Sequence, residues 1–101
     1  MKLELSSEYY ELAAEWQKSL TRLLEEELRK RNIDSEMAQD ICGDFLFNLS
    51  MLHDQGEIKL GREQFNPRIC FHNFEDSLLS IDEDTYIHEF AYNSVATAFD
   101  D

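Results

Sequence analysis

The chain has few of the residues that interrupt or cross-link a fold. Its 101 residues include one proline, three glycines and two cysteines. Because no Pro- or Gly-rich linker divides it, we expect a single globular domain over residues 1–101. No apolar run approaches the ~18 residues that predict a membrane-spanning helix, and the first residues lack the apolar stretch of a signal peptide. These absences predict a cytoplasmic protein with no membrane partner.

The cysteine content points to the same compartment. In a secreted chain, Cys42 and Cys70 could form a disulfide. Without a signal segment, free thiols are the better interpretation, because cytoplasmic cysteines stay reduced. We expect both thiols to be buried.

Positive charge is absent after Arg68. The whole chain carries 9 Lys and Arg against 22 Asp and Glu, a formal charge of −13. Residues 1–33 are nearly neutral at −1, and residues 34–101 hold the remaining −12. Such a charge repels nucleic acid and anionic membranes, and it orients the approach of a basic surface. It therefore favours a basic protein partner or serves solubility alone, and it argues against direct nucleic-acid binding.

Residues 7–31 show the three-and-four spacing of apolar positions that predicts one long amphipathic helix. Ser6 or Ser7 is expected to cap its start, and cations fill its last turn. Twenty-five residues would span about 37 Å, which exceeds the diameter of roughly 26 Å expected for a domain of this length. The helix must then protrude, bend or pack against a second copy, which makes a homodimer through this helix possible.

A second helix is predicted over 36–54, capped by Asp34 or Ser35 and stopped by Gly56. The short turn between the two helices predicts an antiparallel helical hairpin. Apolar spacing indicates which face of the second helix enters the core. We expect a core face of Met37, Ile41, Phe45, Leu49 and Leu52, flanked by Ala38, Cys42 and Leu46.

The helical period is lost over residues 57–73. Alternation in Ile58–Leu60 and in 68–72 predicts a β-hairpin with a loop of about seven residues. Residues 74–81 are ambiguous, with a turn of helix around Leu78 as one interpretation. A third helix is expected over 83–99. The element order α-α-β-β-α defines a mainly helical α+β domain.

Acidic side chains form the strongest candidate site. Glu36, Asp40 and Asp44 recur every fourth residue, so they form a row spaced about 6 Å apart on the second helix. That spacing resembles phosphates along one nucleic-acid strand, although a solvated polar face is the simpler interpretation. Acids near the third helix and one tyrosine, an amphipathic interface residue, extend the candidate set. The full partner-binding set is Glu36, Asp40, Asp44, Asp82, Glu83, Asp84, Glu89 and Tyr86.

Catalytic and metal-binding motifs are not found. His72 and His88, with the two cysteines, are zinc-type ligands, but no CxxC, HxxxH or HExxH spacing joins them. The acids around Asp82 lack the alternating ligands of a calcium loop and suit a helix start instead. No nucleophile motif is present. We expect no cofactor, no metal and no enzymatic activity, and a small metal protein or enzyme remains an alternative.

These observations lead to a functional hypothesis. In size and charge the chain is similar to small phage-encoded inhibitors, bacterial immunity proteins and nucleic-acid mimics, which is a likeness of composition. We expect a non-enzymatic acidic binding protein that inhibits or regulates a basic protein. The alternative is a homodimeric structural or adaptor module whose acidic surface keeps it soluble.

Overall fold

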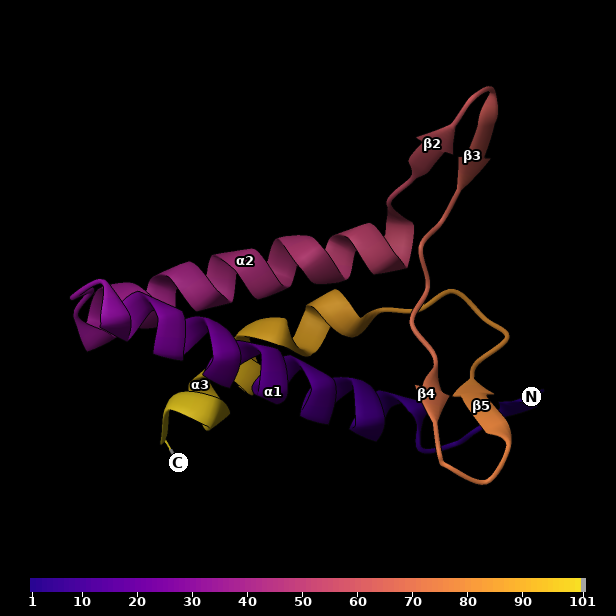
Figure 1. The fold of residues 1–101 in the computed structure, drawn as a ribbon, viewed down its shortest axis with the longest axis horizontal. Helices are drawn as coiled ribbons and strands as arrows, with labels where there is room; N and C mark the ends of the chain where they lie inside the picture. Colours follow the sequence, from indigo (N-terminus) through magenta and orange to yellow (C-terminus); the bar gives the residue numbers. More distant parts are fainter. Residues whose placement is uncertain (101) are drawn as a thin grey trace.

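Two long helices of 22 and 21 residues make up about two fifths of the chain, and a third helix packs against both (Figure 1). The computed structural model describes residues 1–100. The helices are α1 (Tyr9–Lys30), α2 (Ser35–Gln55), the short 3₁₀ helix η1 (Ile87–Phe90) and α3 (Ala91–Asp100). The strands are β1 (Lys2–Leu5), β2 (Ile58–Leu60), β3 (Glu63–Phe65), β4 (Phe71–His72) and β5 (Ser77–Ser80). The fold is mainly helical α+β, and the expected helical hairpin is present.

Local chemistry sets the ends of the long helices. The carboxylate of Asp34 accepts a hydrogen bond of 2.8 Å from the amide of Met37, as an N-cap should. Asn32 adopts a positive φ of 61° in the turn between α1 and α2, a conformation that Asn tolerates better than most residues. The predicted serine cap of α1 is wrong. Glu8 is the N-cap residue, and the Ser6 hydroxyl accepts a hydrogen bond from its amide at 3.1 Å.

The core fills the space that α1, α2 and α3 enclose. One buried cluster consists of Cys42, Leu46, Ala91 and Val95, with leucines of α1 packed against it. A second cluster lies at the other end of α1, around Ile87. Most of the apolar face of α1 is therefore covered within one chain, whereas Leu23 is 62% exposed.

The predicted core face of α2 is wrong at four of its five residues, whereas Leu49 does pack against the first cluster. Ala38, Cys42 and Leu46 are fully buried, whereas Met37 and Phe45 are 52% and 50% exposed. Both faces carry apolar residues at helical spacing, so periodicity could not decide between them. The choice between the two faces depends on contacts with α1 and α3, whose residues pack against Cys42 and Leu46.

Strand pairing also differs from the prediction. Ile58–Leu60 pairs with Glu63–Phe65 through a two-residue turn in which Gly61 has a φ of 63°. The 68–72 segment does not join this hairpin. Its end, β4, pairs antiparallel with β5, and β5 also pairs in parallel with β1, giving the order β1-β5-β4. Both β1 and β5 were missed because they pair with each other from opposite ends of the chain, and such pairing leaves no local sequence signal.

The third helix begins later than the predicted residue 83. Residues 83–86 are non-helical, because the buried carboxylate of Asp54 binds the amides of Ile87 and His88 and fixes the helical start there. Acids at 82–84 therefore lie in a loop instead of a first helical turn.

One of the two predicted buried thiols is exposed. Both cysteines are free, and Cys42 is buried while Cys70 is exposed. Burial, with the nearby Glu25 carboxylate, raises the pKa of the Cys42 thiol. Cys70 lies in an extended segment where side chains alternate, so Ile69 and Phe71 turn toward the second core cluster and Cys70 turns outward.

The β2–β3 hairpin projects beyond the end of α2, away from the other elements (Figure 1). This projection contributes to a radius of gyration of 15.1 Å, above the roughly 13 Å typical of a 100-residue domain. In the described part of the chain, no helix is both long and apolar enough to cross a membrane.

Candidate functional site

The acidic row on α2 is exposed along its whole length. Glu36, Asp40 and Asp44 are all solvent-exposed and lie on successive turns, with a rise of about 6 Å between neighbours. Within residues 1–100, none of the ion pairs involves any of the three. The row therefore presents its full negative charge to solvent.

An apolar row runs beside the acidic row. Each acid is followed directly by an apolar residue, so Met37, Ile41 and Phe45 repeat the same four-residue spacing one position further along. They are 52%, 36% and 50% exposed, and Leu52 continues the row at 37%. Met37, Ile41, Phe45 and Leu52 together form the outer stripe of α2. A carboxylate row and an apolar row thus lie on neighbouring sides of the same helix, about 100° apart around its axis.

Two hollows adjoin the acidic row. One, of about 430 Å³, lies between α2 and α3 and is lined by Gln39, Asp40, Gly43, Asp44, Tyr92 and Val95. The other, of about 290 Å³, lies at the start of α2 and is lined by Asp34, Glu36, Met37 and Asp40. Asp40 borders both, so it occupies the centre of the concave acidic surface.

The aromatic neighbour of the row is Tyr92, a residue outside the predicted set. Its hydroxyl donates a hydrogen bond of 2.8 Å to Asp44, and this bond is the main reason why the pKa of Tyr92 is raised. Gly43 makes the approach possible, because a Cβ there would lie 2.8 Å from Cδ1 of the Tyr92 ring. A glycine inside a helix costs about 1 kcal/mol relative to alanine, so Gly43 was the sequence signal for a close contact.

Tyr86, the tyrosine predicted for the site, lies elsewhere. Its ring stacks on Tyr10 of α1, with centroids 4.2 Å apart, and the residue is 44% exposed. Its stacking on Tyr10 places it beside α1 instead of the row on α2. Glu89 is exposed on η1.

The loop acids form a second, separate group. Asp82, Glu83 and Asp84 are exposed, and the Arg68 guanidinium lies 3.5 Å from the Asp84 carboxylate. The loop is fixed beyond the C-terminal end of α2, because Thr85 donates a hydrogen bond to Asp54. Ten residues of helix, about 15 Å, separate Asp54 from the row at Asp44. That exceeds the Debye length of about 8 Å at physiological salt, so the two groups do not act as one patch.

Asp54 is the most highly connected polar side chain, and the sequence analysis missed it. Its side chain has no exposed surface and accepts hydrogen bonds from the Thr85 hydroxyl at 2.6 Å and the amides of Ile87 and His88 at 3.0 and 2.8 Å. The His88 ring contacts it too. Burial raises the Asp54 pKa, but these bonds outweigh burial and lower it overall. Bonds to backbone amides give this carboxylate the role of a cap for η1.

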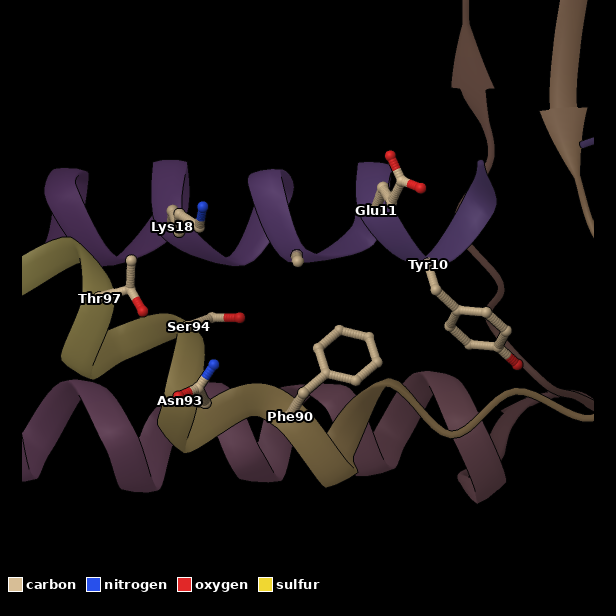
Figure 2. A pocket seen from close by; sticks show the side chains of 8 residues that line it. Tyr10, Glu11, Lys18, Phe90, Asn93, Ser94 and Thr97 are labelled. Atoms are coloured by element: carbon tan, nitrogen blue, oxygen red, sulfur yellow. The ribbon is translucent and has the colours of Figure 1, made fainter. Parts of the chain in front are cut away.

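A further hollow lies between α1 and the η1–α3 segment. It has a volume of about 350 Å³ and is lined by Tyr10, Glu11, Ala14, Lys18, Phe90, Asn93, Ser94 and Thr97. Figure 2 shows the rings of Tyr10 and Phe90 at one end and the polar α3 side chains at the other. Burial and the neighbouring Tyr86 raise the pKa of Tyr10 to about 12. The Lys18 ammonium pairs with Glu15 at 3.0 Å, so the one cation among residues 1–100 that lines this hollow is already neutralised and does not indicate an anion-binding site.

The predicted zinc-type ligands do not come together. In residues 1–100, no three His, Cys, Asp or Glu side chains are grouped so that they could hold a metal ion. Comparisons of the chain with known protein families, curated proteins and solved structures gave no match. The site must therefore be interpreted from its own geometry.

Proposed function

We infer that the chain is a non-enzymatic acidic binding protein that inhibits or regulates a basic protein partner. The single observation that supports this function best is the exposed row of Glu36, Asp40 and Asp44, which bears no cation and borders two hollows. A carboxylate row spaced about 6 Å apart resembles the phosphates of one nucleic-acid strand. A partner that normally binds nucleic acid would meet complementary charge there.

The electrostatics support binding over pure solubility. If the acids served solubility alone, aligning them along one side of the helix would bring no benefit. Like charges four residues apart also destabilise a helix slightly. A partner whose Lys and Arg neutralise the row offsets that cost. The association would be fast at low salt and weakened by added salt, because exposed charges are screened.

Affinity capture with the immobilised chain tests the function. The expected result is a basic protein from cells of the source organism that is retained at about 0.1 M salt and released at about 0.5 M, where the Debye length falls from about 10 Å to roughly 4 Å. The double variant D40N/D44N should retain less of that protein. Glu4→Gln with Glu75→Gln removes the same charge from exposed positions in or beside the sheet and should retain as much as the natural chain.

Two results would overturn the function. One is retention of no basic protein at either salt concentration. The other is equal retention by D40N/D44N and the natural chain. Circular dichroism of each variant confirms that the helices are intact before retention is compared.

A further inference from the structure

Within residues 1–100, the outer stripe is left largely uncovered. Met37, Ile41, Phe45 and Leu52 are between 36% and 52% exposed, although the opposite side of α2 already supplies the core. A surface helix normally has one apolar face and one polar face. Here α2 is apolar on two sides, and exposed apolar patches of this kind mark interaction surfaces in soluble proteins.

Exposed apolar residues also occur on the hairpin that follows α2. The side chain of Leu52 lies against Gly56, and Asn66 donates hydrogen bonds to the carbonyls of Gly56 at 2.7 Å and Leu52 at 3.4 Å. These contacts fix the base of the β2–β3 hairpin to the helix. On the hairpin, Ile58 and Phe65 are cross-strand neighbours, and they are 51% and 45% exposed.

Charge decides which occupant fits the outer stripe. A second copy would bring a further net charge of −13 and a second acidic row alongside the first. Like charges placed together at an interface are strongly unfavourable. A partner with Lys and Arg beside its apolar residues would neutralise Glu36, Asp40 and Asp44 while it covers the stripe. The occupant is therefore basic and apolar at once.

The spacing of the stripe decides the shape of the occupant. Its members recur at intervals of four, four and seven residues, so they form a straight ridge along α2 of about 22 Å from Met37 to Leu52. Ridges at four-residue spacing pack against the grooves of another helix, and amphipathic helices bind apolar surfaces through anchors at such spacing. About 15 residues of partner helix cover that length.

We propose that the outer stripe of α2 is the docking face for an amphipathic helix of the basic partner, with its apolar residues on Met37, Ile41, Phe45 and Leu52 and its Lys and Arg along the acidic row. This docking face rests on the proposed function, since it specifies where and through which chemistry the basic partner binds. The partner helix lies along α2, on the side away from the core.

Two synthetic helical peptides of about 15 residues provide the probe. Both carry leucine at three-and-four spacing, and the remaining positions are lysine in one and glutamate in the other. Fluorescence anisotropy should show that the lysine peptide binds the natural chain and that the glutamate peptide does not. The double variant I41S/F45S should lower affinity for the lysine peptide at least tenfold. D40N/D44N should lower it less and should flatten its dependence on salt.

A matched control removes apolar side chains elsewhere. Leu3 and Leu5 are 62% and 63% exposed on β1, so L3S/L5S deletes as much exposed apolar surface without touching α2. It should bind the lysine peptide as the natural chain does. Equal binding by I41S/F45S and L3S/L5S would overturn the docking face.

Two further measurements separate the possible failures. Sedimentation measures the oligomeric state. A dimeric natural chain together with a monomeric I41S/F45S variant would overturn the proposal in favour of a second copy on the stripe. The captured basic protein provides the other measurement. If immobilised I41S/F45S retains the basic protein fully while D40N/D44N does not, the proposed docking face is wrong and the acidic binding function stands. If no basic protein is retained at all, the function itself fails.

Discussion

The two sides of α2 show opposite uses of apolar residues. The inner side is small and partly polar, with Ala38, Cys42 and Ser50 all fully buried. The outer side is larger, with Met37 and Phe45 half exposed. Hydrophobicity alone therefore did not select the core positions. The side of α2 with more large apolar residues is the one left exposed.

Polar groups reinforce the inner side. Gln17 donates hydrogen bonds from its amide nitrogen to the Ser50 hydroxyl at 3.0 Å and to the Ile87 carbonyl at 2.9 Å. These bonds hold α1, α2 and η1 together at one point, and buried polar groups that are paired in this way specify one arrangement of the core. Among residues 1–100, the side chains of the outer stripe form no equivalent bonds, so these positions are expected to tolerate change.

Truncating one residue on each side should give the largest contrast. Leu46→Ala removes a fully buried side chain and should destabilise the protein by about 2–5 kcal/mol, because a cavity is left behind. Ile41→Ala, at an exposed position, should cost less than about 1 kcal/mol. Urea unfolding of the two variants measures both values. Equal losses would mean that the stripe is part of the core after all.

The buried carboxylate should give the next largest effect. Asp54→Asn keeps the size of the side chain but loses charge-assisted bonds to Thr85, Ile87 and His88, each worth about 1.5–3 kcal/mol. We expect a loss of roughly 3 kcal/mol at pH 7. Urea unfolding at neutral pH measures it, and a loss under ~1 kcal/mol would contradict the capping role.

The pH dependence of that loss has a defined sign. The folded pKa of Asp54 lies below its ordinary value of 3.8, so the ionised form is the one that the fold stabilises. This stability is present above the unfolded pKa and disappears as the pH falls through the folded pKa. The difference between the natural chain and Asp54→Asn should therefore be constant near neutrality and shrink below about pH 4. A difference that grows on acidification would contradict this.

Gly43→Ala should have a smaller effect on stability and a clear spectroscopic one. The added methyl group meets the Tyr92 ring at 2.8 Å, so the half-exposed ring must move away. The gain of about 1 kcal/mol in helix propensity offsets part of the cost. Because Tyr92 then loses its bond to Asp44, its raised pKa should fall toward 10.0. Ultraviolet titration of the phenol measures this shift, with Tyr92→Phe as the assignment control. An unchanged titration would mean that the ring did not move.

The acidic row should give the smallest effect. D40N/D44N removes like-charge pairs that cost about 0.2–0.5 kcal/mol each, so the variant should be slightly more stable in dilute buffer. Added salt screens the same repulsion, and the gain should vanish near 1 M. Thermal unfolding at two salt concentrations measures the difference. A loss of stability at low salt would show that the row supports the fold.

The fold class and the helical hairpin could be predicted because their signals are local. Three-and-four spacing located α1 and α2 to within about two residues, and Asp34 marked a helix start correctly. The strands were harder to predict, because β1 and β5 have four residues each and meet across most of the chain. The start of η1 depended on Asp54, which lies more than thirty residues earlier.

The candidate site was predictable only in part. The row of Glu36, Asp40 and Asp44 follows from sequence spacing, because a helix places every fourth residue on one side. Sequence spacing did not predict that Asp82–Asp84 are separate from that row. It also did not predict that Tyr92, instead of Tyr86, lies beside the row. Both depend on how η1 and α3 pack against α2, and contacts between distant segments leave no periodic trace in the chain.

By itself, the sequence determined the helices, the excess of acid and the alignment of carboxylates on α2, since these properties depend on neighbouring residues and on composition. Which side of α2 faces the core depends on tertiary contacts, because two apolar faces satisfy the same periodicity. Packing against α1 and α3 buried Ala38, Cys42 and Leu46 and left Met37, Ile41 and Phe45 exposed beside the acidic row.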